Sequence, residues 1–69
     1  MEARLNERQK GIIRQLQVQG EVTSGWCRSE FGITYDTANR DLLDLVDAGL
    51  LSRIGRGRST RFVLVQAGP

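Results

Sequence analysis

Residues 31–42 read FGITYDTANRDL, and this stretch decides the fold that the rest of the chain is expected to adopt. Gly32 favours the end of one helix, because glycine readily takes the left-handed conformation found after a helix C-terminus. Thr34 favours the start of the next, because its hydroxyl can accept a hydrogen bond from a free amide of the first turn. Two helices joined by a turn of three or four residues form a helix-turn-helix unit.

The helices on both sides of this turn follow from apolar spacing. The later one is predicted over residues 35–48, and the earlier one over 24–31, after a short β-prone segment at 21–23. The inner stripe of the later helix has four members: Ala38, Leu42, Leu45 and Val46. Trp26 and Phe31, with Phe62 further along, are expected to hold the short helix against a sheet.

A further helix is predicted at the start of the chain, over residues 6–18. Asn6 can act as its N-cap, and Gln9 can complete a capping box. Its apolar stripe consists of Leu5, Ile12, Ile13 and Leu16. Gly11 inside this helix is either a close-packing position or a tolerated weakness, since glycine costs about 1 kcal/mol relative to alanine there.

The last third of the chain is predicted to form a β-hairpin. Residues 50–54 and 60–65 are β-prone, and the basic, glycine-rich segment 55–59 separates them. The predicted fold is therefore α+β: a winged helix-turn-helix in the order α-β-α-α-β-β, with a two- to three-stranded antiparallel sheet. One domain is expected over residues 1–69, ordered from about 5 to 65, with a tail at 66–69.

Composition argues against several classes of function. The 69 residues include no His and a single Cys, Cys27, so neither a histidine-based catalytic site nor the usual Cys/His zinc site can form. We expect no enzyme, no cofactor, no metal and no small-molecule site, and a buried Cys27. No apolar run is long enough to span a membrane, and the first residues lack the apolar core of a signal peptide, so a cytoplasmic protein is expected.

The formal net charge of +2 hides an uneven distribution. Residues 52–61 carry four arginines and no acid, whereas residues 36–47 carry four aspartates and one arginine. A concentrated basic segment is the electrostatic signature of a phosphate-binding surface. The sequence therefore indicates a polyanionic partner for the hairpin.

The stretch 31–42 also resembles the helix-turn-helix signature of DeoR-type bacterial regulators. The resemblance rests on Ile33, Thr34, Thr37 and the run Arg40-Asp41-Leu42, and it continues through residues 47–51 and 54–58. A similar winged-helix module occurs at the C-terminus of Fic-type proteins and of ATPase-like putative transcriptional regulators. DeoR-type proteins usually carry two arginines before the aspartate, whereas this chain has Asn39-Arg40. The resemblance implies a transcriptional regulator, or the DNA-binding module of a larger protein.

The hypothesis for function is binding of double-stranded DNA, with a recognition helix at about 35–48 and a basic wing at about 54–61. The start of such a helix contacts base edges in the major groove, and Arg and Asn can make bidentate contacts to guanine and adenine. The candidate DNA-binding residues are Thr34, Tyr35, Asp36, Thr37, Asn39, Arg40, Arg53, Arg56, Arg58 and Arg61. The glycines beside Arg56 and Arg58 would let the backbone approach a duplex. Arg53 and Arg61 are expected to face each other across the hairpin.

Two further expectations accompany this hypothesis. In the resembling families, Asp41 sits beside the inner stripe, suited to pairing with a base on a neighbouring helix. Since one module buries only about 600–1,000 Å² against DNA, a homodimer or a parent protein is expected to add affinity. The alternative is a winged-helix module for protein interaction, dimerisation or regulation without DNA binding, favoured by the acidic segment 36–47 and an outward-facing Leu43.

Overall fold

The structure is a computed structural model that describes residues 4–65, apart from the side chain of Arg58. The predicted tail at 66–69 lies outside this range. The elements are α1 (Glu7–Gln19), α2 (Ser24–Phe31), α3 (Tyr35–Asp47), β1 (Leu51–Ile54), a 3₁₀ turn (Gly57–Ser59) and β2 (Arg61–Leu64). Three helices followed by a two-stranded antiparallel sheet make the predicted small α+β, winged-helix-like fold.

The predicted short strand at 21–23 is reduced to a single bridge. The backbone amide of Val22 donates to the carbonyl of Phe62 at 3.0 Å, and the amide of Phe62 donates back at 2.8 Å. This one pairing ties the segment before α2 to the edge of β2. The sheet therefore has two full strands and one bridging residue.

Two helix starts follow the predicted caps, Asn6 and Thr34. Asn6 and Gln9 form the capping box: the Asn6 side chain accepts from the Gln9 amide at 2.7 Å, and the Gln9 side chain accepts from the Asn6 amide at 3.0 Å. Thr23 caps α2 and Thr34 caps α3 through their hydroxyls. Glycines in the left-handed conformation follow α1 and α2, as predicted. Each helix bound differs from its prediction by at most one residue.

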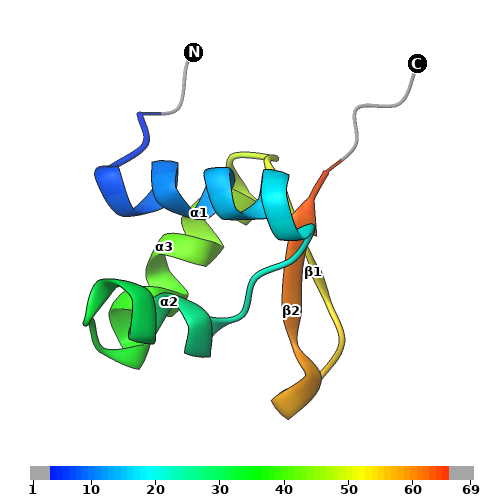
Figure 1. The fold of residues 1–69 in the computed structure, drawn as a ribbon. Helices are drawn as coiled ribbons and strands as arrows, with labels where there is room; N and C mark the ends of the chain where they lie inside the picture. Colours follow the sequence, from blue (N-terminus) through cyan, green and yellow to red (C-terminus); the bar gives the residue numbers. More distant parts are fainter. Residues whose placement is uncertain (1–3, 66–69) are drawn as a thin grey trace.

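The core lies where α1, α3 and the sheet meet, with α2 closing one side (Figure 1). Buried side chains from the three helices, both strands and the bridge residue Val22 fill it: Ile12, Leu16, Val22, Cys27, Ala38, Leu42, Leu45, Leu51 and Phe62. Burial raises the pKa of the Cys27 thiol to about 11, with a smaller contribution from the nearby charge of Asp41. Cys27 is therefore a protonated packing residue, as expected.

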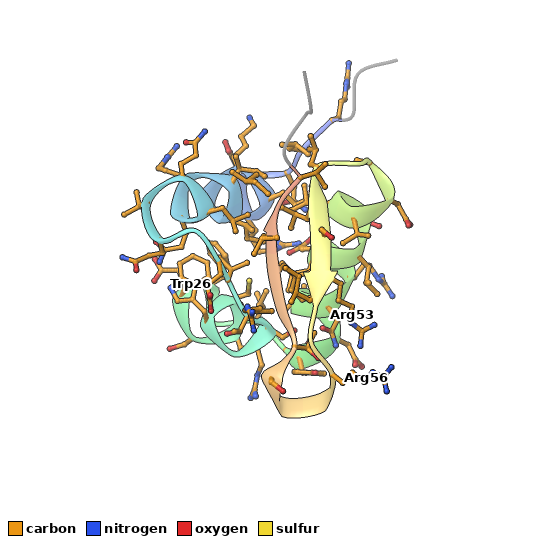
Figure 2. The ribbon with its side chains drawn as sticks, turned by 90° about the vertical axis from the view of Figure 1, so that its right-hand side faces the viewer. Trp26, Arg53 and Arg56 are labelled. Atoms are coloured by element: carbon orange, nitrogen blue, oxygen red, sulfur yellow. The ribbon has the colours of Figure 1, made fainter. Side chains whose placement is uncertain are left out.

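The aromatic pair of α2 packs elsewhere than predicted. Trp26 and Phe31 meet edge to face, with ring centroids 5.7 Å apart, and both line a hollow against α1 rather than holding α2 against the sheet. Figure 2 shows Trp26 between the two helices, away from the strands. A Cβ on Gly11 would lie 3.2 Å from the ring of Phe31, which makes Gly11 a close-packing position.

Candidate nucleic-acid interface

The turn between α2 and α3 sets the direction in which α3 begins. Gly32 has a φ of +62°, and Ile33 packs against the core, so the chain reverses within three residues. The hydroxyl of Thr34 accepts from the amide of Thr37 at 3.2 Å and donates to the Thr37 hydroxyl at 3.0 Å. Both predicted threonines are thus occupied in capping α3.

The exposed part of α3 has two sides of different character. One side carries Tyr35, Asn39 and Leu43, each one turn apart, and it lines a groove beside the hairpin. The other, which we call the outer side of α3, carries exposed charged residues: Asp36, Arg40, Asp44 and Asp47. The predicted residues Asn39 and Arg40 therefore point in different directions. Tyr35 is 54% exposed.

The groove is an open hollow of about 650 Å³ between the start of α2, the side of α3 that carries Asn39, and the hairpin. Ser24 lines it from α2, while Arg53, Gly57 and Phe62 line it from the hairpin. In Figure 1 the hairpin tip, α2 and the start of α3 lie at one end of the molecule, and α1 covers the other end. The tertiary structure thus brings the predicted recognition helix and the predicted wing to a common surface.

Arg53 and Arg56 supply the positive charge at this surface. Both are exposed, and neither makes an ion pair with another of the described residues. Figure 2 shows them on the same edge of the hairpin, with α3 behind it. Arg58 belongs to the 3₁₀ turn between the strands, and its side chain lies outside the described part of the structure.

The prediction that Arg53 and Arg61 face each other is wrong. Arg53 pairs with Phe62 across the hairpin, and Ile54 pairs with Arg61. Because side chains alternate along a strand, this offset of one residue puts the two arginines on opposite faces of the sheet. Arg61 instead lies 3.6 Å from a carboxylate oxygen of Glu21, away from the groove.

The conformation of the hairpin tip accounts for the glycine at its start. Gly55 has a φ of +89°, and a Cβ there would lie 2.4 Å from the carbonyl oxygen of Ser59. The amide of Ser59 donates to the carbonyl of Arg56, and the amide of Thr60 donates to that of Gly57. Gly55 is therefore required by the turn itself, whereas close approach to a duplex was the reason proposed from the sequence.

Asp41 is the buried acid of α3, and it is structural, as expected. Arg8 donates to it from Nε at 2.6 Å and from Nη2 at 3.3 Å, and Asn6 Nδ2 donates at 3.0 Å. Burial raises the pKa of Asp41, but the hydrogen bonds from Arg8 and Asn6 and the charge of Arg8 outweigh it, so the pKa is lowered. The sequence did not identify Arg8 as the partner, because 33 residues separate the two.

Ser24 is a groove residue that the sequence prediction missed. Its hydroxyl donates to Oδ1 of Asn39 at 2.7 Å, joining the first residue of α2 to the first half of α3. No local pattern could have revealed this contact, since it depends on how the two helices cross.

Comparisons with known proteins add no further constraint: no protein-family model matches the chain, and a search of curated proteins found no significant match. Within residues 4–65, no helix is both long and apolar enough to cross a membrane. The proposals on function therefore rest on the residues and their geometry.

Proposed function

We propose that this domain binds double-stranded DNA through the end of the molecule where α3 and the hairpin meet. The observation that carries the proposal is the open groove that joins Tyr35 and Asn39 of α3 to Arg53 of the hairpin. An exposed helix start next to unpaired arginines combines the two elements that duplex recognition needs, namely base-edge contacts and phosphate contacts.

Each part of the surface has a distinct role in this proposal. The first half of α3 enters the major groove, where Tyr35, Asn39 and Arg40 contact base edges. Arg53 and Arg56 bind phosphates alongside, with Arg58 assigned to the same task from its place in the turn. The resemblance of residues 31–42 to DeoR-type regulators supports a role in transcription, either as a small regulator or as a module of a larger protein.

A salt titration tests the proposal. Short duplexes are titrated with the protein at two salt concentrations, and the slope of log affinity against log salt is compared with that of Arg53→Ala plus Arg56→Ala. Loss of two phosphate contacts should reduce the slope by about 1.8. The matched control is Arg4→Ala plus Arg14→Ala, which removes the same charge from exposed positions outside the groove.

The outcomes separate cleanly. We expect the variant Arg53→Ala plus Arg56→Ala to bind duplexes more weakly and with a smaller salt slope, while the control variant keeps the affinity and slope of the wild type. Absence of duplex binding at low salt, or equal losses in the two variants, contradicts it.

A protein-interaction role is the second candidate, and one observation favours it. Asp36 and Asp44 lie one helical turn on either side of Arg40, so acids flank the arginine on the outer side of α3. Leu43, on the adjoining groove side of α3, is 46% exposed. If this surface binds a protein or a second copy of the chain, Leu43→Glu should abolish self-association or partner binding in sedimentation experiments. If Arg53→Ala plus Arg56→Ala also leaves duplex affinity unchanged, protein interaction is favoured over DNA binding.

A further inference from the structure

The hydrogen bond between Ser24 and Asn39 engages one end of the Asn39 amide. Oδ1 accepts from the Ser24 hydroxyl at 2.7 Å, and the contact is half-buried between α2 and α3. The amide nitrogen Nδ2 makes no hydrogen bond within the described residues. Asn39 therefore has its acceptor engaged inside the protein and its two N–H donors available.

We propose that Ser24 is a positioning residue that makes Asn39 a hydrogen-bond donor toward the duplex, so that Asn39 selects guanine. The proposal rests on the DNA-binding function proposed above and deepens it by naming a base preference. Asn39 is suited to this role because it lines the groove one turn after Tyr35, within the first half of α3.

The chemistry of the base edges gives the preference. In the major groove, guanine presents two acceptors, N7 and O6, whereas adenine presents one acceptor, N7, and one donor, the N6 amino group. An asparagine that reads adenine needs both its donor and its acceptor. Ser24 takes one of the two lone pairs of Oδ1 and directs this oxygen toward α2, so the N–H groups are the part of the amide left to meet a base. These groups match guanine, and we expect a preference of about tenfold over adenine at this position.

Removing the Ser24 hydroxyl frees Oδ1 and should change the base that Asn39 prefers. In Ser24→Ala the Asn39 amide can present both its donor and its acceptor, so the preferred base should change from guanine to adenine. Ser24→Thr keeps a hydroxyl at the same position and should retain guanine. Ser29→Ala, an exposed serine of the same helix, is the matched control and should also retain guanine.

The probe is a pool of duplexes with a randomised central segment, selected by each protein and sequenced. The position in the duplex that Asn39 contacts is the one whose base preference disappears when Asn39→Ala is used in the selection. Thermal unfolding of every variant checks that it is folded. The expected result is guanine for the wild type, Ser24→Thr and Ser29→Ala, and adenine for Ser24→Ala.

Three results overturn the inference while leaving DNA binding intact. These are adenine at the Asn39 position in the wild type, the same base in the wild type and Ser24→Ala, and no position that depends on Asn39, which would mean that the amide binds a phosphate. If the wild type retains no duplex from the pool at low salt, the proposed function itself fails. The two failures are therefore distinguishable.

Discussion

Asp41 is a buried residue, and Thr60 is a half-buried residue whose hydroxyl oxygen is buried; the two have opposite balances of hydrogen bonds. The carboxylate of Asp41 is 4% exposed and receives donors from Arg8 and Asn6, so its charge is compensated on the α1 side. The hydroxyl oxygen of Thr60 is buried without a partner among the described residues. The hydrogen bonds to Asp41 should stabilise the fold, and the unpaired hydroxyl of Thr60 should weaken it.

For Asp41, Asp41→Asn should lower the free energy of unfolding by about 2 kcal/mol near neutral pH, because the donors on Arg8 and Asn6 lose a charged acceptor. The folded-state pKa of Asp41 is lowered, so its contribution is complete above the unfolded pKa of about 3.9 and is lost as the pH falls through the folded value. Urea unfolding followed by Trp26 fluorescence should show the difference between the two proteins shrinking below about pH 4.

Asp44→Asn is the matched control for this experiment, since Asp44 is exposed on the same helix. Its effect should stay within about 0.5 kcal/mol. A gap between wild type and Asp41→Asn that stays constant down to strong acid would contradict the assigned role of the ion pair.

For Thr60, Thr60→Val should raise the free energy of unfolding by about 1 kcal/mol, because it keeps the branched shape and removes an unpaired buried hydroxyl. Thr23→Val should lower the free energy of unfolding by about 1 kcal/mol, since the Thr23 hydroxyl caps α2. Thermal or urea unfolding measures both. A loss of stability in Thr60→Val would mean that its hydroxyl has a partner in solution.

At the scale of elements, the hairpin depends on its tip. The six residues from 55 to 60 separate the two strands, and their 3₁₀ turn sets the register that pairs Arg53 with Phe62. This register decides that Arg53 lies on the groove side of the sheet and Arg61 on the other side. Conformation at Gly55 therefore determines which arginines reach the candidate interface.

Gly55→Ala should destabilise the protein more than Gly57→Ala. Both glycines have positive φ, which costs a residue with a Cβ about 1–2 kcal/mol. Only at Gly55 does the added Cβ also collide with backbone, the carbonyl of Ser59, while at Gly57 nothing lies within 4 Å. Urea unfolding of the two variants gives the comparison, and equal losses would contradict the turn geometry described above.

At the scale of the whole molecule, charge is separated by structure as well as by sequence. Exposed arginines gather on the hairpin, and three of the four acids of α3 lie on its outer side beside Arg40. A duplex that contacts the first half of α3 would meet attraction from the hairpin and repulsion from Asp44 and Asp47. The dependence of duplex affinity on these acids should therefore report how close the outer side of α3 lies to the duplex.

Replacing both acids, Asp44→Asn plus Asp47→Asn, should tighten duplex binding about three- to tenfold at low salt and have little effect at high salt, where exposed charges are screened. Glu7→Gln plus Glu30→Gln makes the same charge change at exposed positions outside the groove and should have a smaller effect. Fluorescence anisotropy with a labelled duplex measures both. Identical affinities in wild type and the aspartate variant would mean that the outer side of α3 stays away from the duplex.

Local interactions let the sequence by itself determine the helices, their caps and the inner stripes of α1 and α3. Caps and helical periodicity involve residues within a few positions of one another, so Asn6 and Thr34 could be identified without a structure. The positions of charged residues along the chain also show, without a structure, that α3 is acidic and the hairpin basic. These features fixed the fold class before any contact between elements was known.

Only the tertiary structure decided which of these residues come together. The pairing of Arg8 with Asp41, the bond from Ser24 to Asn39, and the separation of Arg53 from Arg61 depend on helix crossings and on strand register. A one-residue offset in a strand, or a small rotation of a helix, moves a side chain to the opposite face, and no local pattern records that choice. The candidate interface is therefore a product of packing, built from residues that the sequence could place only on their own elements.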